Sequence, residues 1–169
     1  MTSTSTPAGT VTITDSGTTI AFERRLAHPI DRVWAALTDP DERAQWFGRT
    51  SIDPRESGTL ETVAEGPPAS ETMRTLSGRI LVWDPPRVLE HEWQQTTIGF
   101  STVRYELRAD GAQTVLRLTH RMSSDGSAFG YVPGEHAYLD RLQAYLGGAH
   151  LPDWVERYDE VQHLYGALR

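Results

Sequence analysis

Residues 133–148 (PGEHAYLDRLQAYLGG) place the strongest constraint on how this chain can fold. Their apolar side chains recur at steps of three and four residues: Tyr138, Leu139, Leu142, Tyr145 and Leu146. Polar side chains fall on the other side of that stripe: Asp140, Arg141 and Gln143. This spacing predicts an amphipathic helix that ends at Gly147 and Gly148. A lone helix of this length is marginal in water, so another part of the chain must cover its apolar stripe.

The chain before this helix consists mainly of strand-like segments separated by turns. Alternating side chains in residues 19–27 predict a strand with one covered face. Further strands are predicted at residues 51–53, 59–63, 76–83, 88–94, 100–108 and 114–121. Residues 109–112 suit a hairpin turn, whereas residues 65–70 and 123–132 are predicted as loops from their composition.

Two short helices are predicted within residues 28–48 (HPIDRVWAALTDPDERAQWFG). Pro40 should end the first, because the residue before a proline avoids helical backbone, and Asp39 can cap the second. The first helix carries a stripe at helical spacing: Ile30, Val33, Trp34 and Leu37. A last short helix is predicted after Asp153, with this covered face: Val155, Tyr158, Val161 and Tyr165.

Composition restricts the class of protein. With 169 residues, 38% of them hydrophobic, the chain is expected to form one globular domain, residues 18–169, after a flexible segment, residues 1–17. It has no cysteine, and all 16 basic residues are Arg, which excludes thiolate and lysine chemistry. The net charge of −7 argues against a nucleic-acid partner. No apolar run approaches the ~20 residues of a membrane span, so we expect no membrane partner and a cytoplasmic location.

The order of elements predicts the α+β class. Strands in one block, with helices segregated elsewhere, indicate an antiparallel sheet of about six to seven strands wrapped on the long C-terminal helix. Three segments then resemble a known superfamily: HPIDRVWAALTDPDERAQWFG, GRILVWDPPRVLEHEW and HAYLDRLQAYLGGAHLPDW, which are residues 28–48, 78–93 and 136–154.

These segments resemble the SRPBCC, or START-like, superfamily, and within it the branch named for activators of the heat-shock-90 chaperone ATPase. The resemblance spans residues 18–165. It implies the helix-grip fold, with two short helices after the first strand and a ligand-sized cavity between sheet and long helix. The superfamily also resembles START lipid-binding domains, polyketide cyclase/aromatases and pollen-allergen-like carriers, so the fold alone does not imply one function.

Strand parity predicts which side chains face that cavity, because alternate residues of a strand point to opposite faces. On the long helix, His136 lies one turn before Leu139. The predicted ligand-binding residues are Trp34, Trp46, Ile80, Val82, His91, Trp93, Tyr105, Leu118, His120, His136, Tyr138, Leu139 and Leu142. An apolar wall with a few polar side chains is typical of small-molecule sites, so we expect a small apolar or aromatic ligand.

Two alternatives belong to other functional classes. One is a cofactor-free cyclase or aromatase that moves protons with His120 or His136, since imidazole titrates near neutral pH. The other is a protein-interaction module resembling the chaperone activators, and a homodimer is compatible with either. Structural roles for these histidines remain open beside the catalytic ones. His91, His120 and His136 lack the local spacing of zinc ligands, so neither a metal nor a cofactor is expected.

Overall fold

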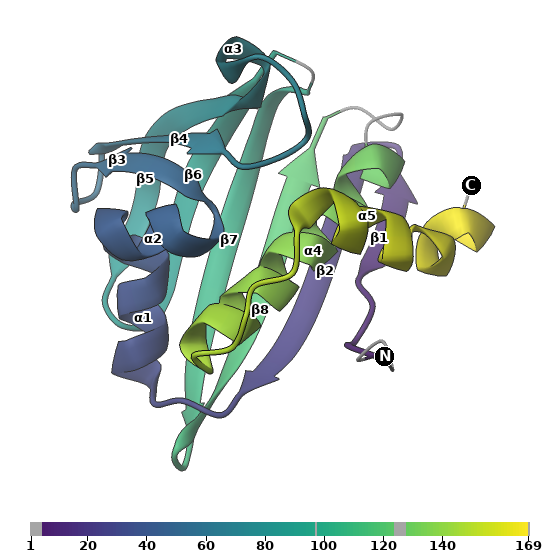
Figure 1. Cartoon of the computed structure of the whole chain (residues 1–169). Helices are drawn as coiled ribbons and strands as arrows, with labels where there is room; N and C mark the ends of the chain where they lie inside the picture. The colour runs from purple at the N-terminus through teal and green to yellow at the C-terminus, as the bar shows by residue number, and fades with distance from the viewer. Residues whose placement is uncertain (1–4, 97, 124–127, 169) are drawn as a thin grey trace.

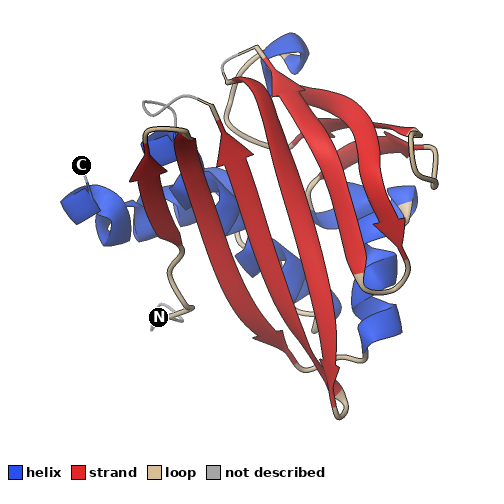
Figure 2. Cartoon of the chain, turned by 180° about the vertical axis from the view of Figure 1, so that it is seen from behind, coloured by secondary structure: helices blue, strands red, loops and turns tan. Residues whose placement is uncertain are grey.

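One antiparallel sheet of eight strands forms the body of the molecule, and the helices cover one of its faces (Figure 1). The computed structural model describes residues 5–96, 98–123 and 128–168. The strand order is β1-β2-β8-β7-β6-β5-β4-β3. Seen from behind, the opposite face of the sheet carries none of the helices that the described residues form (Figure 2). The predicted α+β class with a long helix on a curved antiparallel sheet is confirmed, with eight strands instead of six to seven.

The strands agree closely with the segments that alternation predicts. They are β1 (Thr10–Thr14), β2 (Gly17–Leu26), β3 (Gly48–Ile52), β4 (Thr59–Ala64), β5 (Thr75–Asp84), β6 (Val88–Gln95), β7 (Gly99–Asp110) and β8 (Gln113–Met122). β1 lies within the segment that was predicted to be flexible and pairs with β2. Gly111 has a φ of 61° in the turn between β7 and β8, which is a conformation that favours glycine.

The helices are α1 (Ile30–Thr38), α2 (Pro40–Trp46), α3 (Glu71–Arg74), α4 (Ala128–Leu146), α5 (Trp154–Gln162) and the 3-10 helix η1 (His163–Leu168). The Asp39 side chain accepts hydrogen bonds from the backbone N–H groups of Asp41 and Glu42, so the predicted cap of α2 is confirmed. The helix α3 was not predicted. None of the helices formed by the described residues is long and apolar enough to cross a bilayer.

The long helix α4 begins five residues earlier than its predicted start at Pro133. Part of the predicted loop at residues 123–132 is therefore helical, and residues 124–127 of that loop lie outside the described residues. Pro133 lies inside α4, where a proline removes one backbone hydrogen bond and its ring crowds the carbonyl four residues earlier.

Strand register confirms most of the predicted parity. Leu89, Val103 and Leu116 are fully or almost fully buried in the hydrophobic core. The register of β5 against β6 shifts between Ile80 and Val82, so Ile80 pairs with the inward His91 but Val82 pairs with the outward Glu90. Val82 therefore faces away from α4, contrary to strict alternation, because the bulge adds a residue to one strand.

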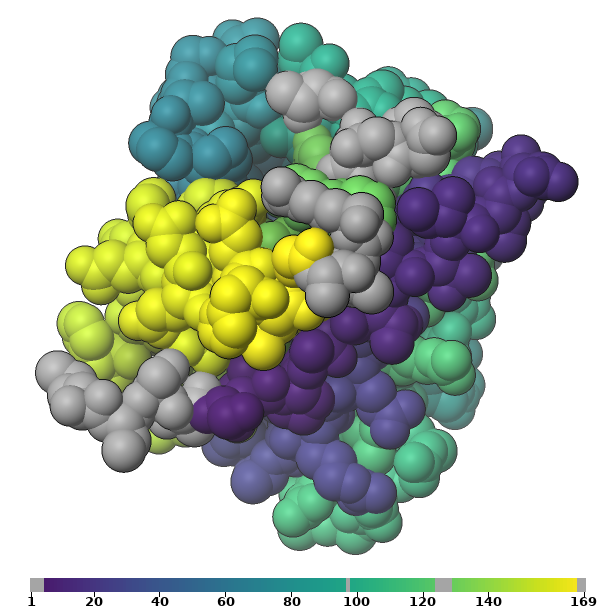
Figure 3. Space-filling view, turned by 90° about the vertical axis from the view of Figure 1, so that its right-hand side faces the viewer, coloured from purple at the N-terminus to yellow at the C-terminus, as the bar shows by residue number. Residues whose placement is uncertain are grey.

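A second layer lies over α4. Asp140, predicted on the solvent side of that helix, is buried because β2 and α5 enclose it. Arg24 Nη1 and Arg157 Nε each donate to its carboxylate at 2.7 Å. The N-terminal residues lie against the C-terminal helices (Figure 3), where the Gly9 N–H donates to the Tyr165 hydroxyl at 2.9 Å. The buried side of α5 is formed by Trp154, Arg157 and Val161, whereas Val155 is 40% exposed.

Candidate functional site

The interface between the sheet and α4, where a ligand-sized cavity was expected, is filled by side chains. The void that the described residues leave there has a volume of about 10 Å³. Its walls are formed by Trp46, Phe47, Trp93, Tyr105, Leu118, Glu135, Tyr138 and Leu139. The ring of Phe47 stacks on that of Tyr138 with centroids 4.3 Å apart, and its edge meets Trp46. Large rings from α2 and α4 thus occupy the space that the helix-grip arrangement leaves.

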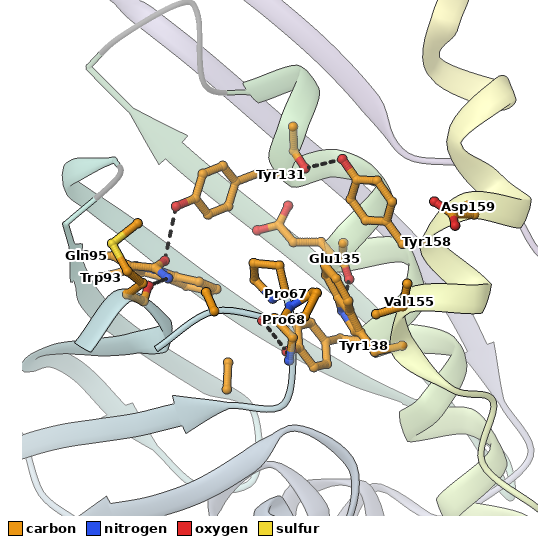
Figure 4. Close-up of a pocket in the computed structure, with 17 residues that line it drawn as sticks. Pro67, Pro68, Trp93, Gln95, Tyr131, Glu135, Tyr138, Val155, Tyr158 and Asp159 are labelled. Carbon is orange, nitrogen blue, oxygen red and sulfur yellow. Dashed lines mark hydrogen bonds between the residues drawn. The ribbon is translucent and has the colours of Figure 1, made fainter. Parts of the chain in front are cut away.

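A larger pocket, of about 630 Å³, lies beside this filled interface (Figure 4). It is bounded by the first half of α4, by α5, by the end of β6 and by the loop that connects β4 to α3. Its lining residues are Ala64, Gly66, Pro67, Pro68, Ala69, Met73, Trp93, Gln95, Gly130, Tyr131, Gly134, Glu135, Tyr138, Trp154, Val155, Tyr158 and Asp159. Five of these are aromatic, and most of the wall is apolar.

The β4–α3 loop is held to α4 by the Tyr138 hydroxyl. That hydroxyl donates to the Gly66 carbonyl at 3.0 Å and accepts from the Gly66 N–H at 2.9 Å. The Trp154 ring packs closely against Gly66 and Gly134, where an added Cβ would lie 2.2 Å and 3.0 Å from the ring. Glycine at these two positions therefore lets α5 approach both the loop and α4, and this close approach shapes the pocket.

At the end of the pocket next to β6, hydrogen bonds hold a group of side chains in place. The Gln95 side-chain oxygen accepts from Trp93 Nε1 at 2.9 Å and from the Tyr131 hydroxyl at 3.1 Å. The Gln95 amide donates to the Met73 carbonyl at 2.8 Å. These bonds hold the ring of Trp93, on β6, and the ring of Tyr131, on α4, against the pocket, and Figure 4 marks the bond between Tyr131 and Gln95 with a dashed line.

Glu135 carries the carboxylate at the base of the pocket. One of its oxygens, Oε1, forms a short hydrogen bond with His120 Nδ1. The other imidazole nitrogen, Nε2, lies 2.8 Å from Ser101 Oγ. Ser101 Oγ in turn donates to the Trp93 carbonyl at 2.8 Å. This chain of hydrogen bonds therefore links α4 to the strands β8, β7 and β6.

The order serine, histidine, carboxylate resembles a hydrolytic triad, but the geometry excludes a nucleophilic serine. Ser101 is 1% exposed, and its only proton is used in the hydrogen bond to the Trp93 carbonyl. It does not line the pocket, so no bound molecule can reach its oxygen. The three residues instead form a buried polar network that fixes the Glu135 side chain.

The structure brings only part of the predicted site together. Trp93 and Tyr138 line the pocket, and His120 lies behind Glu135. Trp46, Tyr105, Leu118 and Leu139 surround the small void instead. Ile80, His91 and Leu142 are buried in the core, and Trp34 packs on Trp83 at a centroid distance of 5.3 Å. Val82 faces away, as the register shift of β5 requires.

His136 points away from the pocket. Its Nδ1 lies 2.7 Å from the Tyr165 hydroxyl, and its Nε2 lies 2.7 Å from Thr6 Oγ1 and 3.4 Å from Asp140. Burial lowers the pKa of His136 to about 4, against the opposing effect of the Asp140 carboxylate. Burial likewise lowers the pKa of His91 to about 3. Neither histidine meets the pocket wall.

Sequence reasoning identified Tyr138 but missed the rest of the helix face that lines the pocket. Tyr131, Glu135 and Tyr138 recur at steps of four and three residues, which is the spacing of one helical face. That signal was present, but the predicted helix began at Pro133 and so excluded Tyr131. Gly66, Pro67 and Pro68 had only a loop composition, which carries no information about what the loop packs against. Among the described residues, no group of three or more His, Asp or Glu side chains is arranged to hold a metal ion.

Comparison with solved structures places this architecture in a known class. CalU16 from Micromonospora echinospora is 27% identical, with a TM-score of 0.73 over 95% of each chain. The protein encoded by gene BPP1335 of Bordetella parapertussis is 32% identical, with a TM-score of 0.72 over 98% of this chain and 94% of that one. A conserved protein of unknown function from Enterococcus faecalis, EF2215, shares the fold at 15% identity and a TM-score of 0.73, over 95% and 92% of the two chains.

The fold, with its long helix on a curved sheet, is that of a helix-grip protein of the SRPBCC superfamily. The family model described as "Activator of Hsp90 ATPase homolog 1-like protein" matches residues 27–147. The chain therefore belongs to that family, and the predicted resemblance is confirmed. No curated protein sequence matches this chain.

Proposed function

We propose that the protein binds a small, largely apolar ligand in the pocket between α4, α5 and the β4–α3 loop. The observation that carries this proposal is a pocket of about 630 Å³ with five aromatic rings in its wall. Small-molecule sites commonly enclose about 300 to 1,000 Å³ and combine an apolar wall with a few fixed polar groups. The pocket differs in place from the cavity that the helix-grip resemblance implies, because large rings fill that position.

The geometry favours binding over catalysis by a pocket histidine. His120 is fully buried and both of its ring nitrogens are occupied by Glu135 and Ser101. His136 is bonded on the far side of α4. Among the described residues, the pocket wall contains no histidine. The cyclase or aromatase alternative therefore has neither of its two predicted proton carriers in contact with a bound molecule.

A filling variant tests the proposed pocket. Ala69 is exposed at the pocket rim, so Ala69→Trp should occupy the space without disturbing the core. Native mass spectrometry of freshly purified protein, followed by denaturing extraction, would detect a co-purifying molecule. 1-Methylnaphthalene serves as a probe ligand. Its binding is measured from the NMR chemical-shift changes of the indole N–H groups of Trp93 and Trp154.

We expect the probe to shift both indole signals in the natural protein and neither in Ala69→Trp. Ala149→Trp, at an exposed alanine outside the pocket, is the matched control and should bind like the natural protein. Equal probe binding by Ala69→Trp and Ala149→Trp would show that the ligand site lies elsewhere.

Membership of the family favours a second candidate, an interaction with a chaperone of the Hsp90 type. Its test is the ATPase rate of the chaperone with and without this protein. A rate that does not change at saturating protein, together with no complex in native electrophoresis, would eliminate this candidate.

A further inference from the structure

The Glu135 carboxylate has one oxygen that the protein satisfies and one that it does not. Oε1 is bonded to His120 Nδ1. Among the described residues, Oε2 has no hydrogen-bond partner, although Glu135 is only 5% exposed. Leaving a buried carboxylate oxygen without a partner is costly, so a second partner is expected at this position. Figure 4 shows the Glu135 side chain among the pocket residues, near the rings of Tyr131 and Tyr138.

Counting protons shows what kind of partner Oε2 requires. Ser101 gives its hydroxyl proton to the Trp93 carbonyl, so His120 Nε2 must donate to Ser101 Oγ. A single proton then lies between His120 Nδ1 and Glu135 Oε1. Whether it sits on the nitrogen or on Oε1, the other oxygen carries no proton. Oε2 is an acceptor in both arrangements, and its partner must be a donor.

The charges around the pocket agree with a donor, including a positively charged one. Two carboxylates line it, Glu135 at the base and Asp159 at the rim. Among the described residues, no Arg or His side chain lines the wall. The guanidinium of Arg74 is turned behind the loop, where it donates to the Ala64 and Ala69 carbonyls. Aromatic faces in the wall also attract cations.

We propose that the ligand presents a hydrogen-bond donor, a hydroxyl or a protonated amine, to Glu135 Oε2 while its apolar body lies against the aromatic wall. This inference rests on the proposed function and names the chemical class of the ligand. The Ser101–His120 network positions the carboxylate, so that Glu135 cannot turn away to find another partner. A neutral hydrocarbon of the same shape would fill the pocket but leave Oε2 without a partner.

Three probes of one shape separate these possibilities: 1-methylnaphthalene, 1-naphthylmethanol and 1-naphthylmethylamine. Their dissociation constants are measured from the indole N–H shifts of Trp93 and Trp154. We expect the alcohol and the amine to bind about tenfold or more tightly than the hydrocarbon, which is the gain of one hydrogen bond to a charged or polarised acceptor.

Two substitutions assign that gain to Glu135. Glu135→Leu removes the acceptor and should erase the preference of both polar probes over the hydrocarbon. Glu135→Gln can donate to His120 with its amide and still accept with its oxygen, so it should keep the alcohol but weaken the amine. Glu156→Leu and Glu156→Gln, at an exposed position of α5 that does not line the pocket, are matched controls and should change none of the three constants.

The outcomes separate this inference from the proposed function. Equal binding of all three probes by the natural protein would overturn the donor requirement and leave the apolar pocket intact. Binding of none would overturn both. An undiminished preference in a folded Glu135→Leu protein would place the donor's partner elsewhere and also overturn the inference. If Glu135→Leu fails to fold, as thermal melting would reveal, the ranking in the natural protein and in Glu135→Gln decides alone.

Discussion

The two sides of α4 differ in how completely they are packed. On the sheet side, rings from α2, β6 and α4 leave a void of only about 10 Å³. On the α5 side, the same helix borders a pocket of about 630 Å³. Tyr138 contributes to both, with its ring stacked on Phe47 and its hydroxyl bonded to Gly66. The first region holds the fold together, whereas the second is an open space bordered by a loop and by α5, so stability and binding should respond to different substitutions.

The largest expected effect comes from opening the packed side. Trp46 is 1% exposed, and its Nε1 donates to the Ala36 carbonyl at 2.9 Å. Trp46→Ala should lower the free energy of unfolding by about 3–5 kcal/mol, because it removes a buried ring and leaves a cavity. Denaturant titration measures this loss. A loss below about 1 kcal/mol would mean that this region is not the tightly packed one.

A smaller effect on stability, with a strong effect on binding, is expected at Gly66. An alanine Cβ there would lie 2.2 Å from the Trp154 ring, so the ring and α5 must move. Gly66→Ala should cost about 1–3 kcal/mol and weaken probe binding, because α5 forms one wall of the pocket. Gly130→Ala, where nothing lies within 4 Å of the added Cβ, is the control in the same wall. Unchanged binding by Gly66→Ala would separate the pocket from the position of α5.

Acid should lower the free energy of unfolding, because two histidines are buried in their neutral form. Burial lowers the pKa of His91 from 6.5 to about 3 and that of His136 from 6.5 to about 4. The unfolded chain therefore binds more protons between pH 6.5 and these values, so stability falls as the pH falls through that range. Each histidine should cost about 1.5 kcal/mol between pH 6.5 and 5.

The measurement is denaturant unfolding at pH 6.5 and at pH 5. His91→Gln should flatten the pH dependence, whereas His150→Gln, at an exposed position, should leave it unchanged. Identical slopes for the natural protein and His91→Gln would show that His91 is protonated to the same extent in both states.

The smallest effect on stability is expected at the outer rim of the pocket. Val155 is 40% exposed and lines the pocket. Val155→Ser should change the free energy of unfolding by less than about 0.5 kcal/mol, since surface positions contribute little. It should nevertheless weaken the binding of 1-methylnaphthalene by about threefold, because apolar contact with the probe is lost. Stability and binding that fall together here would contradict the separation of the two regions.

Local patterns predicted the elements that each segment forms. Alternation located the main strands to within about two residues, and Pro29, Asp39 and Asp153 marked the starts of three helices. The stripe of Leu139, Leu142 and Leu146 correctly predicted the long helix that packs on the sheet. These signals are readable because strand parity, helix spacing and capping act over a few residues.

The tertiary structure alone decided where space remains. The pocket joins residues 64–69 to residues 154–159, and nothing in either segment specifies the other. Gly66 contacts the Trp154 ring, and His120 bonds to Glu135, only when β4, β8, α4 and α5 are packed together. The sequence by itself determined a helix-grip protein with large aromatic residues. Which rings fill the core and which line a pocket depends on long-range packing, because volume is shared between segments that are distant in the chain.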